Sequence, residues 1–209
     1  DDSLGREQTA GQEAALKRLG LIPDTMSLRA LLADLLEEQI SGVYDPPTNT
    51  LYVVEGAEDE TLALTVTHEL VHALQDQYLD LDSALNVRGD DDRQLALQSV
   101  MEGQATFEHM RIMFGADMPA IPGGWDRLRE EIRNQRMKWP VLANSPLVIQ
   151  ETLVFPYLSG AEFMRAVRES DPQAMPLTDL PTSSEQIMHP SRYLGTRDAP
   201  TPVPLPTLR

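Results

Sequence analysis

The chain has 209 residues and a formal net charge of −16, from 33 acidic and 17 basic side chains. A field of that sign repels phosphate backbones and anionic lipid, so nucleic acids and membrane surfaces are poor partners. Cysteine is absent, which excludes disulfides, thiolate metal sites and cysteine catalysis, and no apolar run reaches the ~18 residues of a membrane span.

The N-terminal segment predicts two helices. Residues 5–19 have a helical composition, and Pro23 interrupts the pattern that follows. Ser27 is a suitable N-cap for a second helix over residues 28–40, and we expect Gly42 to end it. One apolar stripe runs along this second helix, made of Leu28, Leu31, Leu32, Leu35 and Leu36.

Residues 43–54 favour β structure. Two short apolar segments, at 43–44 and 51–54, flank a Pro-Pro-Thr-Asn turn, which predicts a β-hairpin and is the only strong β signal in the chain. Residues 58–79 return to a helical period. The period is shown by apolar residues at steps of four, which are Leu62, Val66, Leu70 and Leu74. We expect the helix to be apolar on most sides and its polar motif to be buried, because of Val66, Leu70, Val71, Ala73 and Leu74.

The middle of the chain predicts helices separated by loops. We expect a polar loop over residues 80–93, in which the acidic residues 90–92 begin a helix that continues to Phe114, because the helix dipole favours negative charge there. A calcium loop is an alternative, but the EF-hand spacing is missing. A breaker-rich loop at 115–124 and a helix at 125–139 should follow.

The C-terminal part predicts one long helical stretch and an irregular end. Ser145 and Pro146 open a stretch to residue 170 that Pro156 should kink or split. Thr182 and Glu185 form a capping-box pattern before a short helical turn, and the Pro-rich end should be extended. The fold class is therefore mainly α with a small β-hairpin (α+β), in a single domain.

The motif with the clearest chemistry is His68-Glu69-x-x-His72. Side chains four apart share one helix face, so both imidazoles can point at one metal ion. Glu69 projects to a different side and can take a proton from a water on the metal, which is the arrangement of zinc hydrolases.

A third protein ligand must come from elsewhere, because hydrolytic zinc sites use three. The local sequence favours Glu102, an acid among apolar and small residues whose burial would require a cation. Gly103 and Ala105 would let this helix approach the motif helix closely. His109 is an alternative ligand or a neighbour in the cleft, Glu108 is expected to be solvated, and Asp76 either orients a neighbouring group or is exposed.

These segments together resemble the gluzincin metallopeptidases, in particular small bacterial proteins of that group (minimal gluzincins). The likeness is carried by GVYDPPTNTLYV, HELVHALQDQ, EGQAT, FPYLSG and TSSEQIMHP. It implies a zincin-like fold, Zn2+ bound by His68, His72 and Glu102, and Glu69 as general base. One departure is Gln104, where the related block has an acid that would steady a ligand histidine.

The resemblance also implies a division of the chain and a location. Residues 1–41 would be N-terminal helices, 42–195 the metallopeptidase core and 196–209 a Pro-rich tail, with the strand at 51–54 beside the cleft. The acidic first residues show no signal-peptide pattern, but proteins of this group are often secreted or attached to the cell envelope, and we expect the same here.

Peptide hydrolysis needs a donor for the developing oxyanion. His189 and Tyr157 are the candidates, with Tyr193 a third. Tyr157 could instead be a core aromatic, and His189 could anchor the C-terminal segment. That segment, residues 182–190, could also pack across the cleft and restrict access to it.

The sequence therefore favours a zinc-dependent peptidase acting on a peptide or protein substrate. The alternative is a zinc-containing binding or structural domain, an inactive or autoinhibited relative, in which the metal staples two helices together. A third reading is a helical scaffold without metal. The sequence defines neither the cleavage preference nor the oligomeric state.

Overall fold

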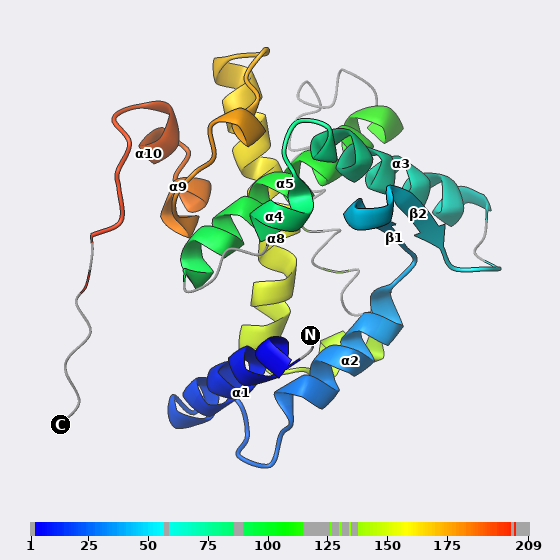
Figure 1. Ribbon diagram of the computed structural model, residues 1–209, viewed down its shortest axis with the longest axis vertical. Coiled ribbons are helices and arrows are strands. Elements are labelled where there is room, and N and C mark those ends of the chain that lie inside the picture. The colour runs from blue at the N-terminus through cyan, green and yellow to red at the C-terminus, as the bar shows by residue number, and fades with distance from the viewer. Residues whose placement is uncertain are drawn as a thin grey trace.

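The computed structural model describes residues 3–56, 59–85, 90–114 and 138–201, with positions 126, 130, 134 and 203. The protein is mainly helical with one two-stranded antiparallel sheet, which confirms the α+β expectation (Figure 1). The elements in chain order are α1 (Ser3–Arg18), α2 (Leu28–Gln39), β1 (Gly42–Asp45), η1 (Pro46–Thr48), β2 (Thr50–Val53), α3 (Asp59–Asp76), α4 (Leu81–Leu85), α5 (Asp91–Phe114), α7 (Pro140–Asn144), α8 (Leu147–Ser170), η4 (Pro176–Thr178), α9 (Ser184–Met188) and α10 (Ser191–Leu194).

Several expectations lie outside the described residues. They are the loop at 115–124, ten of the fifteen residues of the helix at 125–139 and half of the Pro-rich tail. No helix within the described ranges combines the length and the hydrophobicity needed to cross a bilayer.

Helices α5 and α8 pack along each other at the centre of the molecule (Figure 1). Their closest approach is at Gly103 and Gly160, where a Cβ added to Gly103 would lie 2.2 Å from the carbonyl carbon of Gly160. We expected Gly103 to bring α5 close to the motif helix, and this was wrong: its partner is α8. The surrounding core includes Val100, Phe107, Phe163, Met164, Val167 and Ile187.

Pro156 does not split α8, which is continuous from Leu147 to Ser170. Pro156 is itself buried. The loss of one backbone hydrogen bond is tolerated here because packing on both sides of the proline holds the two halves in one helix.

The N-terminal helices pack on α7 and the start of α8 around a second apolar cluster, formed by Ile22, Leu28, Leu35, Leu142 and Ile149. Ser27 caps α2 as predicted, since its Oγ accepts a hydrogen bond from the Ala30 N–H at 3.3 Å. Two expectations for α2 were wrong. Leu36 is 63% exposed, and the helix ends at Gln39, so that Gly42 instead begins β1.

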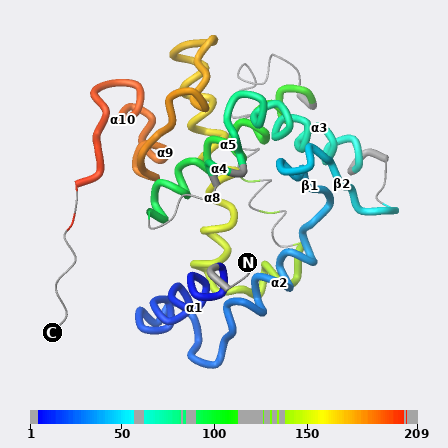
Figure 2. The backbone as a smooth tube through the Cα atoms, viewed as in Figure 1, coloured from blue at the N-terminus to red at the C-terminus, as the bar shows by residue number. Residues whose placement is uncertain are grey.

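The predicted β-hairpin is present and packs beside α3 (Figure 2). Gly42 pairs with Val53 and Asp45 with Thr50, and Asn49 closes the turn in the left-handed region at φ 51°. The expected apolar surround of α3 was wrong, because Leu70 and Leu74 are 56% and 49% exposed. The side of α3 that faces the interior carries polar residues instead.

Residues 81–85 form helix α4 where a loop was expected. Asp80 Oδ1 accepts the Ser83 N–H at 3.0 Å, and Leu81 in α4 is fully buried in the core. Asp90 likewise accepts the Arg93 N–H at 3.0 Å and caps α5, while Asp92 accepts from Ser184. The acidic residues thus begin α5 as predicted, and these caps replace the calcium-loop alternative.

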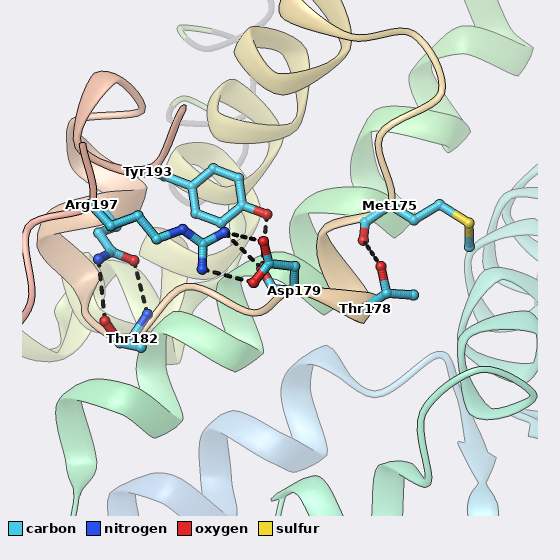
Figure 3. A network of polar contacts seen from close by, with 7 residues as sticks. Met175, Thr178, Asp179, Thr182, Tyr193 and Arg197 are labelled. Atoms are coloured by element: carbon cyan, nitrogen blue, oxygen red, sulfur yellow. Dashed lines mark hydrogen bonds and ion pairs between the residues drawn. The ribbon is translucent and has the colours of Figure 1, made fainter. Parts of the chain in front are cut away.

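The C-terminal segment is held by a polar network (Figure 3). Arg197 lies over the Tyr193 ring at 4.3 Å and pairs with Asp179, whose backbone oxygen accepts the Tyr193 hydroxyl at 2.8 Å. The predicted capping box was wrong: Ser183 is the N-cap of α9 and makes no side-chain cap bond, and the Thr182 N–H donates to Gln186 Oε1 at 2.9 Å.

Candidate metal centre

Three predicted ligands, His68, His72 and Glu102, come together between α3 and α5. Their ligand atoms all lie within 4.8 Å of one another. Glu102 Oε2 is 3.1 Å from His68 Nε2 and 3.5 Å from His72 Nε2. The side chains are 19%, 11% and 17% exposed, in the order His68, His72, Glu102. The helical spacing of the histidines and the sequence context of Glu102 therefore predicted a real cluster.

Two of the three donor-atom separations match those of ligands on a single metal ion. Ligands held ~2.1 Å from a tetrahedral ion lie ~3.4 Å apart, close to the two histidine–Glu102 separations. His72 Nδ1 is 2.9 Å from Gln75 Oε1, which turns Nε2 toward Glu102. Two imidazoles and one carboxylate form a set that could hold a metal ion.

The charges in the cluster also favour a cation. Burial opposes the charge of Glu102, but hydrogen bonds from His68 and His72 outweigh it and lower its pKa to about 2. Burial likewise opposes a proton on His72, but Glu102 and Gln75 outweigh it and raise the pKa. The ionised carboxylate thus draws either a proton or a metal ion to the imidazoles.

Glu69 lies beside this cluster and is held by the hairpin. Its Oε2 accepts the Tyr44 backbone N–H at 2.8 Å, and the Tyr44 hydroxyl donates to Asp76 Oδ2 at 3.0 Å. Asp76 also accepts the Leu81 N–H at 3.0 Å. Asp76 was expected either to orient a neighbouring group or to be exposed. The structure supports the first alternative, and the group that Asp76 orients is Tyr44.

A cavity of about 510 Å³ adjoins the cluster. His68 and Glu69 lie on its wall together with His109 and Tyr157. Much of the remaining lining is apolar and includes Leu64, Met110, Leu142, Leu153 and Val154. The cavity therefore joins the polar cluster to a surface suited to an apolar group.

His109 and Tyr157 flank His68. The His109 ring centroid is 6.5 Å from that of His68, and Tyr157 stacks on His68 at 6.3 Å with 28° between the planes. Burial, and then the charges of Glu102 and Glu69, raises the pKa of Tyr157 well above its ordinary range, so the hydroxyl keeps its proton. Burial and then the charge of His68 lower the pKa of His109. His109 is a neighbour in the cleft, and Tyr157 lies at the site and outside the core.

Other candidates lie elsewhere. His189 is exposed at the end of α9, which Figure 1 shows on the side of the molecule opposite the hairpin. Ser184 at the start of α9 binds Asp92, which precedes Glu102 by ~15 Å along α5 at 1.5 Å per residue. Tyr193 donates to Asp179.

The C-terminal segment 182–190 contributes nothing to the described lining of the cavity, so the described residues do not support the alternative in which it packs across the cleft. Its Ile187 is buried in the α5–α8 core instead. The strand residues that line the cavity also differ from expectation, because Gly42 of β1 does so and residues 51–54 do not. Glu108 is ion-paired with Arg111 at 2.7 Å rather than simply solvated.

Sequence reasoning missed Gln75 and Tyr44. Gln75 lies three residues after His72, on the same helix face, and that spacing was the available signal. Tyr44 acts through its backbone N–H, for which a side-chain pattern gives no signal.

No family model, curated protein or solved structure matches the chain, so the likeness to gluzincins rests on the motifs.

Proposed function

We propose that the protein is a zinc-dependent peptidase of gluzincin type. The observation that carries the proposal is that His68, His72 and Glu102 converge, and that His68 lies with Glu69 on the wall of one cavity. Two histidines and a carboxylate are the ligand set of zinc hydrolases that keep one position for water. Such an ion, when bound, lowers the pKa of a water and polarises a carbonyl.

Each of three residues near the cluster has a separate role in the proposed reaction. Glu69 accepts the proton of the attacking water and delivers it to the leaving amine. Tyr157, whose hydroxyl stays protonated, donates a hydrogen bond to the carbonyl oxygen as negative charge develops there. The Tyr44 N–H holds the Glu69 carboxylate in place through Oε2, which leaves Oε1 to receive the proton.

The lining of the cavity supports a proposal for the class of peptide. Its apolar lining beside His68 and Glu69 suits a leucine or aromatic side chain next to the cleaved bond. A charged side chain in the same place would lose its hydration without gaining a partner among the apolar groups. The proposed substrate is therefore a peptide with a large apolar residue at the cleavage site.

The alternative is a zinc-containing structural or binding domain. The hydrogen bond from Tyr44 to Glu69 favours it, because it gives Glu69 a structural task in joining β1 to α3. The two functions differ in what happens after zinc has bound. A structural domain gains stability from zinc and cleaves nothing.

The test combines metal content with cleavage of a peptide library. We expect about one zinc per chain, cleavage beside apolar residues, and a Glu69→Gln variant that keeps zinc but loses turnover. Glu108→Gln is the matched control, since Glu108 is paired with Arg111 and is not among the ligands. Zinc binding without any cleavage by the unmodified protein would support the structural domain. Failure to bind zinc would remove both functions.

A further inference from the structure

Gln75 is a fully buried amide in the interface between α3 and α5, with an exposure of 1%. Its Oε1 is 2.9 Å from His72 Nδ1. Its Nε2 donates to the Met101 carbonyl oxygen at 3.0 Å and to Gln104 Oε1 at 3.1 Å. A buried amide with three partners of this kind is well satisfied, and its orientation is determined by them.

The Met101 carbonyl sets the direction of every hydrogen bond in this group. A backbone carbonyl can only accept, so the NH₂ end of Gln75 must face it. The oxygen end of Gln75 then faces His72 and requires a proton on Nδ1. In the neutral ring Nε2 is then left with the lone pair and faces Glu102 Oε2 at 3.5 Å, whereas the protonated ring donates to Glu102 from this same atom. The chain of bonds thus selects the one neutral tautomer of His72 that can bind a metal ion toward Glu102.

We propose that Gln75 is the positioning residue for this metal site, fixing both the tautomer and the ring orientation of His72. The inference rests on the proposed zinc function and deepens it. Gln75 also joins the two ligand-bearing helices, since Met101 directly precedes Glu102 on α5. Its task is therefore to hold His72 and Glu102 in a fixed relation before the metal arrives.

The neutral amide has a chemical consequence. A carboxylate that accepts from a ligand histidine raises the basicity of the imidazole, and an amide does so less. Gln104, which stands where the related block has an acid, contacts Gln75 and not a histidine. Its effect on the metal is therefore indirect, whereas a charge introduced at position 75 would act directly on the ligand His72.

The experiment measures the zinc dissociation constant by competition with a chelating dye. Gln75→Met keeps the length of the side chain without its hydrogen bonds, and we expect ~10–100-fold weaker binding. Gln75→Glu keeps the acceptor for His72 but loses the bond to the Met101 carbonyl, so we expect it to bind zinc more tightly than Gln75→Met does. Gln77→Met, at an exposed position just beyond α3, is the matched control and should leave the constant unchanged.

A second readout uses the metal-free protein. Nitrogen NMR of His72 at alkaline pH should show a proton on Nδ1, and Gln75→Met should redistribute it to Nε2. An unchanged tautomer in Gln75→Met, or equal weakening by the Met and Glu variants, would overturn the positioning role. Should Gln75→Met fail to fold, Gln104→Met removes only the outer acceptor, and we expect a smaller loss of affinity. If the unmodified protein binds no zinc, the proposed function fails, but the tautomer measurement still decides the role of Gln75.

Discussion

Replacing Gly160 by alanine tests whether the contact between α5 and α8 sets the geometry of the molecule. A Cβ at this position would lie 2.0 Å from the Ser99 backbone oxygen and 2.9 Å from the Gly103 Cα. An ordinary contact needs about 3.4 Å, so the two backbones must separate by ~1.4 Å at this point. Neither neighbour is a flexible side chain that could rotate away.

The cost can be estimated from two opposing effects. Overpacking of this kind costs ~1–3 kcal/mol and sometimes more, while alanine gains ~1 kcal/mol over glycine in a helix interior. A contact of 2.0 Å with rigid backbone belongs at the upper end of the overpacking range, so the net destabilisation should be ~2 kcal/mol. Each kcal/mol lowers Tm by ~2–4 °C in a domain of this size. Zinc affinity should fall as well, because Gly103 adjoins Glu102 and moves with it.

Gly11→Ala provides the matched control. Gly11 is inside α1, and a Cβ there would meet nothing within 4 Å. The same substitution should therefore stabilise the protein by up to ~1 kcal/mol. Urea unfolding of both variants gives the comparison directly. A Gly160→Ala variant as stable as the unmodified protein would refute the close contact.

Three further predictions follow. Tyr157→Phe should lower kcat by ~10²–10³ with zinc retained and KM little changed, as steady-state kinetics would show. Glu38→Ala removes the acceptor of the Val141 and Leu142 N–H groups at the start of α7, and its cost of ~1 kcal/mol should appear in urea unfolding. The metal-free protein should be most stable between pH 4.5 and 6.5, the ordinary pKa values of Glu102 and His72. The stability that ionised Glu102 contributes is lost as pH falls from 4.5 toward 2. The stability that protonated His72 contributes is lost as pH rises through its elevated pKa. The midpoint of urea unfolding measured against pH tests both losses, and bound zinc should abolish the loss at alkaline pH.

Local signals in the sequence predicted the elements that depend on near neighbours. The spacing of His68 and His72 required only one helix, and the hairpin required only its own turn. Glu102 was found because an acid among apolar residues needs a partner. Each of these inferences uses residues close in the chain, where periodicity and capping rules apply.

The local sequence could not predict which helices, distant from one another in the chain, pack together. Gly103 correctly indicated a close helix contact, but nothing in its neighbourhood distinguishes α8 from α3 as the partner. The apolar spacing on α3 suggested the wrong buried face, because the face opposite Leu70 and Leu74 is paired with polar groups of α5. The same limit applies to the histidines. His109 lines the cavity because of its position along α5, whereas the motif that contains His189 gave no information on where that residue lies.

Four consecutive residues of α5 explain how the core and the metal centre depend on each other. Met101 supplies the carbonyl that orients Gln75, and Glu102 faces both histidines. Gly103 meets α8, and Gln104 accepts from Gln75. Successive helical side chains point in directions about 100° apart, so one turn of α5 touches α3 on one side and α8 on the other. A change in the α5–α8 contact must therefore move the ligand that lies between Met101 and Gly103, and metal affinity should report on core packing as directly as a melting temperature does.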